Sequence, residues 1–110
     1  METWRDIKGW EGIYQVSNQG RVKRTYITTQ ERILKTEVNE DGYVRVALSR
    51  HCKITREYVH RLVATAFPEE CGRKWGQRNE VDHIDGNHAN NYSSNLRWCT
   101  HKQNVGYRFN

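Results

Sequence analysis

Long apolar runs are missing from this sequence, which argues against a membrane partner. The most apolar segment, YVHRLVATAF at residues 58–67, is far shorter than the ~20 residues that a spanning helix needs. The first residues, METWRDIKGWEG, are polar and do not resemble the apolar core of a signal peptide. We therefore expect a cytoplasmic protein.

Cysteine is also scarce. The chain has 3 cysteines, at positions 52, 71 and 99, and no two of them form a Cys-x-x-Cys pair. This spacing argues against a zinc ribbon or a redox motif. We expect three reduced thiols, as is usual for cytosolic proteins.

The 110 residues suffice for one small domain with a modest core. Hydrophobic residues make up only 35% of the chain, but 4 Trp and 6 Tyr add large buried areas. Lys and Arg outnumber Asp and Glu by 18 to 13, which gives a net charge of +5. A basic surface favours polyanions and makes nucleic acid the leading partner, although an ordinary basic soluble protein has the same balance.

The first half of the chain predicts a small antiparallel sheet. GIYQVSNQGRVKR (12–24) is typical of strand, turn and strand, RILKTEV (32–38) of a third strand, and EDGYVRVALSR (40–50) of a turn followed by alternation. In that alternation Val44, Val46 and Leu48 share one face. CKITREY (52–58) is expected to pair back onto it.

The second half predicts a helix and then a strand pair. Val59, Leu62, Val63, Ala66 and Phe67 form one apolar helical stripe that Pro68 ends. A polar linker (68–79), a strand EVDHI (80–84), a turn-rich loop, a strand NLRWCT (95–100) and a short helix (100–107) follow.

The segment EVDHIDGNHANN (80–91) concentrates polar ligands. Asp82 offers a hard oxygen for Mg²⁺ or Mn²⁺, and the neutral imidazole of His83 can take a proton from water near pH 7. Neighbours on a strand face opposite sides, so the pair can serve one site only where the strand ends, and Gly86 makes such a bend plausible. A metal and a base suffice to hydrolyse a phosphodiester. The alternative is an ordinary Asn-rich turn.

Three ordered motifs resemble the HNH endonuclease family, in the form found in phage intron-encoded nicking homing endonucleases. They are WRDIKGWEGIYQVSNQGRVKR (4–24), VHRLVATAF (59–67) and VDHIDGNHANNYSSNLRWCTHKQNV (81–105). The resemblance implies an α+β fold in which an antiparallel β module (1–57), expected to contact DNA, precedes a ββα-metal domain (58–110). It also implies that homing members continue beyond the motif with further DNA-contacting helices.

The resemblance further implies a role for each motif residue. Asp82 and Asn104 would bind a divalent metal ion, Mg²⁺ or Mn²⁺. His83 would be the general base, and Asn95 would tie down the loop that holds it. The product would be a nick in double-stranded DNA with a 5′-phosphate and a 3′-hydroxyl, and we favour a monomer. Asn87, Asn90 and Asn91 are expected to serve turn geometry, Asp85 to form a turn, and Trp98 to lie in the core.

Basic residues around the predicted sheet are candidates for DNA contact, with a solubilising surface as the alternative. They are Arg21, Lys23, Arg24, Arg45, Arg50, Lys53 and Arg97. Two other functions stay open. One is a non-catalytic DNA-binding module with the same fold. The other is a zinc-stabilised domain that uses Cys71, Cys99 and His101, against which the irregular ligand spacing argues.

Overall fold

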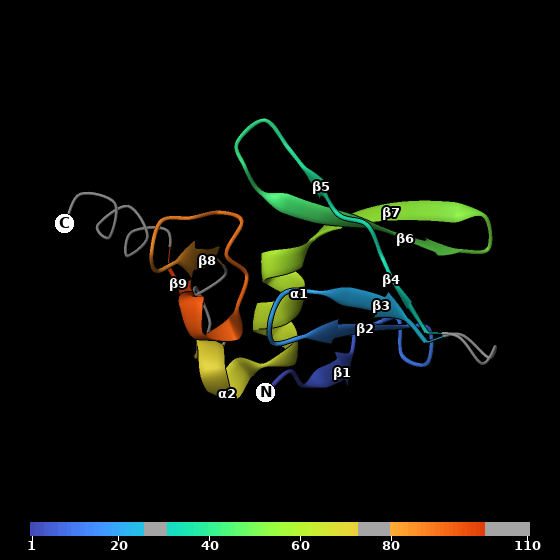
Figure 1. The fold of residues 1–110 in the computed structure, drawn as a ribbon, viewed down its shortest axis with the longest axis horizontal. Helices are drawn as coiled ribbons and strands as arrows, with labels where there is room; N and C mark the ends of the chain where they lie inside the picture. Colours follow the sequence, from blue (N-terminus) through green and yellow to red (C-terminus); the bar gives the residue numbers. More distant parts are fainter. Residues whose placement is uncertain (26–30, 73–79, 101–110) are drawn as a thin grey trace.

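A computed structural model of the chain describes residues 1–25, 31–72 and 80–100. One helix, α1 (Val59–Ala66), lies at the centre of these residues. Antiparallel sheets from the first half lie on one side of it and a pair of strands from the second half on the other (Figure 1). The predicted α+β class is confirmed.

The first sheet is antiparallel and has the strand order β1-β2-β3-β4. Its strands are β1 (Trp4–Asp6), β2 (Tyr14–Ser17), β3 (Val22–Arg24) and β4 (Arg32–Ile33). The predicted turn joins β2 to β3, and there the Ser17 hydroxyl oxygen accepts the amide N–H groups of Gln19 and Arg21. Sequence analysis missed β1, whose short polar stretch has no alternating pattern.

The second sheet has the order β5-β6-β7, with β5 (Glu37–Val38), β6 (Val44–Arg50) and β7 (Lys53–Tyr58). Val44, Val46 and Leu48 are buried, as the alternation predicted. β7 pairs back onto β6 from Arg50↔Lys53 to Arg45↔Tyr58, also as predicted.

The prediction of one sheet with a continuous third strand at 32–38 is wrong. Arg32–Ile33 pairs with β3, whereas Glu37–Val38 pairs with β6 in the other sheet. Both two-residue segments are exposed. Because register is set by a buried face, this segment has nothing to hold it as one strand, and it passes from one sheet to the other.

The predicted helix is confirmed as α1, and Val59 and Val63 are fully buried within it. The expected polar linker is partly wrong, because α2 (Pro68–Cys71) begins it. Pro68 occupies the first turn, where its missing N–H costs nothing. The Cys71 thiol is buried and donates to the carbonyl oxygen of Ser93 at 3.3 Å.

The predicted strand pair consists of β8 (Glu80–His83) and β9 (Leu96–Cys99), with a 3₁₀ turn (Ser93–Asn95) before β9. Their register places Asp82 opposite Arg97 and His83 opposite Leu96. The Trp98 indole N–H donates to the carbonyl oxygen of Ala64 on α1 at 3.1 Å, so the prediction of a core Trp98 is confirmed. The helix predicted at 100–107 lies outside the described residues.

A single cluster of buried side chains joins both halves of the chain, from Ile7 to Trp98. α1 contributes its apolar stripe to this cluster, and β2, β6, β8 and β9 all pack against the helix. Among the described residues, no helix is long and apolar enough to span a membrane. The domain boundary between residues 57 and 58 stays a prediction.

Tyr14 links the two sheets through its hydroxyl group. The hydroxyl accepts the Ser49 amide N–H at 3.0 Å and lies 3.3 Å from the Ser49 carbonyl oxygen. We expect Tyr14→Phe to lower the free energy of unfolding by about 1–2 kcal/mol, because both backbone groups lose their partner. Urea denaturation measures this change, with Tyr92→Phe at an exposed tyrosine as the control. Equal losses in the two variants would contradict the role given to the Tyr14 hydroxyl.

Candidate active site

Asp82 and His83 lie at the end of β8, where the chain leaves the strand pair. The amide N–H of Gly86 bonds to the carbonyl oxygen of His83 at 2.9 Å and closes a turn, with Gly86 at a φ of 78°. A positive φ of this kind favours glycine. His83 faces the buried side of the pair, and its neighbour Asp82 faces the other side with Arg97.

Asp82 forms an ion pair across the strands with Arg97. The Arg97 Nε and Nη2 atoms lie 3.0 Å and 2.8 Å from Asp82 Oδ2. The Asp82 side chain is 13% exposed and that of Arg97 is 35% exposed, so solvent reaches both. Because both contacts go to Oδ2, Oδ1 is the oxygen that a cation could take without breaking the pair.

His83 is held by a buried asparagine that follows it in the loop. Its Nε2 lies 2.8 Å from Asn91 Oδ1, and the two residues are 5% and 4% exposed. An amide oxygen only accepts hydrogen bonds, so Nε2 must carry the proton. In the neutral ring Nδ1 is then the basic nitrogen.

Burial lowers the pKa of His83 below its ordinary value, while the hydrogen bond to Asn91 and the charges of Asp82 and Asp85 act in the opposite direction. The charge of His88 adds to the lowering. The ring is therefore neutral near pH 7, which a base requires.

Asn95 ties together the loop between β8 and β9. Its Nδ2 donates to Asp85 Oδ1 and to the Asn90 carbonyl oxygen, both at 2.9 Å, and its Oδ1 accepts the Asp85 amide N–H at 3.1 Å. Asp85 also accepts the amide N–H of Asn87. As expected, Asp85 shapes the turn, and the bonds from Asn90, Asn87 and Asn95 lower its pKa.

Two turns from the first half of the chain brace the same loop. At the β5–β6 turn, His88 stacks on Tyr43 with ring centroids 4.1 Å apart, and its Nδ1 lies 2.9 Å from the carbonyl oxygen of Asp41. At the β2–β3 turn, the carbonyl oxygen of Asn18 accepts the amide N–H of Ser93 at 2.8 Å. Sequence analysis gave no indication of this contact of His88.

His60 on α1 completes a cluster of rings around His83. The ring centroids of His60 lie 5.1 Å from His83, 5.4 Å from Tyr43 and 5.4 Å from Tyr58. Burial, followed by the charges of His83, Arg61 and His88, lowers the pKa of His60 to about 3. A pocket of about 290 Å³ opens beside this cluster and is lined by Tyr58, Arg61 and Glu80 among others.

Comparison with known proteins identifies both halves of this arrangement. Residues 2–49 match the NUMOD4 motif and residues 57–105 match the HNH endonuclease family. The chain carries an HNH endonuclease domain behind a NUMOD4 motif. The predicted resemblance is confirmed.

Three relatives extend this result. The chain is 49% identical to DNA endonuclease I-HmuI of Bacillus phage SP01, over 93% of this chain and 55% of that protein. It is 35% identical to an uncharacterized HNH endonuclease, L245, of Acanthamoeba polyphaga mimivirus, over 84% of this chain and 26% of that protein. It is 38% identical to a putative HNH homing endonuclease, YosQ, from the SPbeta prophage of Bacillus subtilis, over 64% of this chain and 39% of that protein.

A solved structure agrees with these sequence matches. The structure described as DNA binding and cleavage by the HNH homing endonuclease I-HmuI superposes with a TM-score of 0.83 at 44% identity, over 97% of this chain and 57% of that one. The chain thus spans about half the length of I-HmuI and less of the other relatives.

The donors of the HNH domain fit a hard divalent cation. Asp82 offers a partly exposed carboxylate oxygen, as Mg²⁺ and Mn²⁺ prefer. Asn104, the other predicted ligand, lies outside the described residues. Within residues 1–25, 31–72 and 80–100 no three His, Cys, Asp or Glu residues form a metal-binding group. Burial raises the pKa of Cys71 to about 12, which disfavours the thiolate that a zinc site needs.

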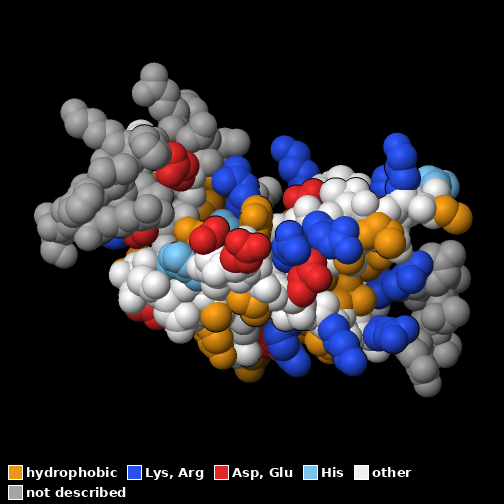
Figure 2. Space-filling model, turned by 90° about the horizontal axis from the view of Figure 1, so that it is seen from above, with side chains coloured by type: hydrophobic (Ala, Val, Ile, Leu, Met, Phe, Trp, Pro, Cys, Tyr) orange, Lys and Arg blue, Asp and Glu red, His pale blue; other side chains and the backbone are white. Residues whose placement is uncertain are grey.

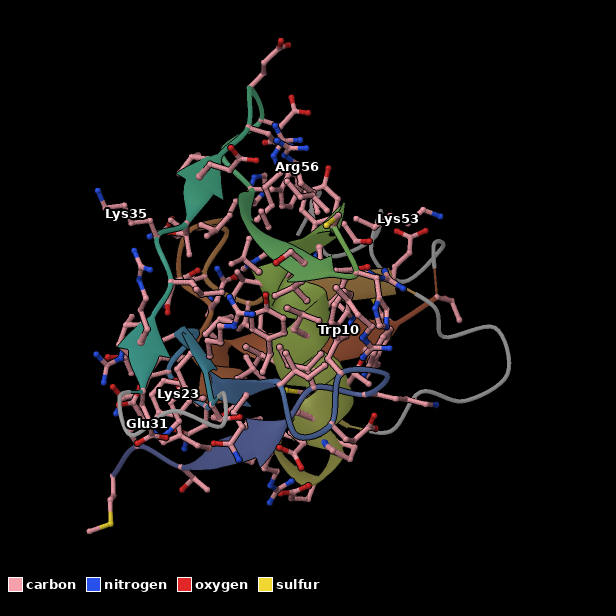
Figure 3. All side chains as sticks on the ribbon, turned by 90° about the vertical axis from the view of Figure 1, so that its right-hand side faces the viewer. Trp10, Lys23, Glu31, Lys35, Lys53 and Arg56 are labelled. Carbon is pink, nitrogen blue, oxygen red and sulfur yellow. The ribbon has the colours of Figure 1, made fainter. Side chains whose placement is uncertain are left out.

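The predicted DNA-contacting residues fall into separate groups. Arg21, Lys23 and Arg24 belong to β3 and the turn before it, where Lys23 pairs with Glu31 at 2.8 Å. Arg45, Arg50 and Lys53 belong to β6 and β7. In Figure 3 Lys23 and Lys53 lie well apart, and the set is divided between two sheets.

Figure 2 shows one face on which Lys and Arg side chains gather, over the three-stranded sheet. Several of these cations have protein partners. Arg45 and Arg56 share the Glu37 carboxylate, and Arg50 donates to the carbonyl oxygen of Gly9 while lying over the Trp10 ring. Among the described residues, Lys53 at the end of the β6–β7 hairpin forms no ion pair and is exposed.

Sequence analysis missed Asn91, His60 and Tyr43 as neighbours of the predicted base. Asn91 was assigned to turn geometry alone, and this is wrong, because its side chain bonds to His83. The run of asparagines gave no signal that separates Asn91 from Asn87 or Asn90. His60 falls outside the predicted apolar stripe of α1, although the folded helix buries it.

The low pKa of His60 makes the stability of the fold depend on pH. Its folded pKa of about 3 lies below its ordinary value of 6.5, so the unfolded chain binds more protons between these limits. The contribution of neutral His60 to the free energy of unfolding is fully present above pH 6.5 and is lost as the pH falls toward 3. We expect a loss of up to ~1.4 kcal/mol per pH unit from this group.

Urea denaturation from pH 7.5 to 4 measures this loss. His60→Phe keeps an aromatic ring beside Tyr43 and should flatten the slope relative to wild type. His51→Asn at an exposed turn is the control, since asparagine accepts the positive φ found there. Parallel slopes for wild type and His60→Phe would show that His60 does not carry the pH dependence.

Proposed function

We propose that this chain is a nuclease domain that hydrolyses one phosphodiester bond in double-stranded DNA, with His83 as general base and Asp82 and Asn104 as metal ligands. The observation that carries the proposal is a buried, oriented imidazole that directly follows a partly exposed carboxylate at the end of the HNH strand pair, close enough for the charge of Asp82 to act on the pKa of His83. I-HmuI, which shares 49% of its residues with this chain over the matched region, is a DNA endonuclease.

The proposed reaction is an in-line attack by water on phosphorus. His83 Nδ1 takes a proton from the water, and the new P–O bond forms as the bond to the 3′ oxygen breaks. The 3′ oxygen takes a proton from solvent, so the products are a 5′-phosphate and a 3′-hydroxyl. Mg²⁺ or Mn²⁺ held by Asp82 and Asn104 supplies positive charge that offsets the charge on the phosphate and the leaving oxygen.

Two further residues support this chemistry. Asn95 fixes the turn at Asp85 and Asn90, and this sets the direction in which the chain leaves His83. Arg97 lies beside Asp82, within reach of any phosphate that the Asp82 site binds. We therefore assign Asn95 to loop positioning and Arg97 to phosphate contact.

One site of this kind cuts one strand, so a monomer makes a nick. We infer that the β6–β7 hairpin and its basic face bind the DNA backbone. Lys53 at the hairpin end is exposed, and Arg45, Arg50 and Arg56 lie along the same two strands. The β3 group, Arg21, Lys23 and Arg24, forms a second candidate surface. The alternative function is a DNA-binding module without catalysis.

A supercoiled-plasmid assay tests the nuclease. We expect open circles with Mg²⁺ or Mn²⁺ and none with EDTA, and DNA ligase should reseal the circles because both ends are suited to ligation. His83→Ala should lower the rate by at least ~10²-fold, since a positioned base contributes that much. Its affinity for DNA in EDTA should match wild type.

Thr65→Ser serves as a control, because this exposed residue on α1 belongs to neither proposed DNA surface and to none of the groups around His83. Full activity of His83→Ala would show that another group is the base. DNA binding without conversion under any metal would support the non-catalytic module, and linear product at early times would indicate cutting of both strands.

The hairpin proposal predicts a change in salt dependence. Lys53→Met should reduce the slope of log affinity against log salt by about 1, because one phosphate contact is lost. Fluorescence anisotropy with duplex DNA in EDTA measures the slope. Lys35→Met, at another exposed lysine, is the matched control. An unchanged slope in Lys53→Met would show that the hairpin end does not contact the DNA.

A further inference from the structure

The β2–β3 turn of the NUMOD4 segment reaches the loop of the HNH domain at one close contact. Gly20 lies in this turn at a φ of +84°, and a Cβ placed on it would be 2.8 Å from Asn91 Cβ and 3.1 Å from the Asn91 carbonyl oxygen. Real Cβ atoms essentially never show a contact as short as 2.8 Å, and 3.1 Å is already tighter than most of their contacts, so the turn and the loop pack this closely because residue 20 is glycine.

Hydrogen bonds within the turn and to Thr3 fix the turn that carries Gly20. The Ser17 hydroxyl oxygen accepts two amide N–H groups, and Asn18 Oδ1 accepts the amide N–H of Thr3 at 3.0 Å. The same turn bonds to Ser93, two residues beyond Asn91. Asn91 is therefore enclosed by a rigid neighbour that contacts its backbone and its Cβ.

Asn91 in turn fixes the orientation of His83. The 2.8 Å bond from Nε2 to Asn91 Oδ1 stabilises one tautomer and one rotation of the ring. Without an acceptor at this position, the buried ring would lose its partner and could place the proton on Nδ1, the nitrogen that must be free to act as a base.

We propose that Asn91 is a positioning residue for His83, and that the β2–β3 turn holds Asn91 in place through Gly20, so that the NUMOD4 segment forms part of the catalytic arrangement. This proposal rests on the proposed function, in which His83 is the base. It assigns the N-terminal segment a role in the rate of cleavage that is separate from contact with DNA.

Two substitutions at Asn91 separate positioning from packing. Asn91→Leu keeps the branch at Cγ and removes the acceptor but is larger, whereas Asn91→Asp keeps both the size of the side chain and an acceptor oxygen. We expect Asn91→Leu to lower the single-turnover nicking rate at saturating protein by about 10- to 100-fold, the range found for partners that orient a site's ligands. The protein concentration that half-saturates the DNA should not change. Asn91→Asp should keep most of the wild-type nicking rate.

A glycine pair tests the support from the turn. Gly20→Ala drives a methyl group into Asn91 and should lower the nicking rate without weakening DNA binding. Gly12→Ala is the matched control, because Gly12 has a φ of +79° and, apart from its chain neighbours, no atom of the described residues lies within 4 Å of the point that a methyl group would occupy there. It carries the same backbone strain and should keep the wild-type rate.

The ring proton of His83 gives a readout that needs no cleavage. ¹⁵N NMR of the imidazole distinguishes its two tautomers, and we expect Nε2–H in wild type and Asn91→Asp, and a mixture in Asn91→Leu. A wild-type Nδ1–H tautomer, or an Asn91→Leu variant that nicks at the wild-type rate, would overturn the positioning role. Absence of nicking by wild type with every metal would refute the proposed function instead, while the NMR result would still decide the placement of the proton.

Discussion

The packing of α1 is the constraint on which the rest of the structure depends. Val59 and Val63 are fully buried, and strands from both halves of the chain lie against the helix. The helix spans only Val59–Ala66 and is too short to be stable alone in water, so its stability comes from these contacts. Because one short helix supports both the sheets and the strand pair, the distance between the basic face and His83 is set by packing and not by a linker.

The structure places the candidate site where the two halves meet. His83 belongs to the strand pair, but its neighbours Tyr43, Asn91 and His60 come from a turn, a loop and the helix. Each of these elements has its own hydrogen bonds, which lowers the entropy cost of holding the ring in one orientation. The proposed catalytic geometry is therefore a property of the folded whole, and neither half contains it alone.

Sequence alone predicted the features that follow from local patterns. The alternation of Val44, Val46 and Leu48 and the helical stripe at Val59 and Val63 both proved to be core positions, since period and burial are linked. The motif resemblance singled out Asp82, His83 and Asn95, and the structure brings them to the end of β8 and the loop that follows it. The break between Ile33 and Glu37 and the contact of Gly20 with Asn91 were not predictable in this way. They depend on which strands become neighbours in space, and an isolated glycine or a short polar segment does not carry that information.

One edge of the molecule has a consequence for its behaviour in solution. β7 is the outer strand of its sheet, and the side chain of Ile54 on it is 64% exposed. An outer strand with exposed apolar residues is a template for pairing with a second molecule. Lys53 and Arg56 flank Ile54 on this strand, and positive charges on an edge repel a like edge. The cations proposed to bind DNA thus also discourage aggregation. Replacing them with neutral residues should lower the solubility of the protein as well as its proposed affinity for DNA.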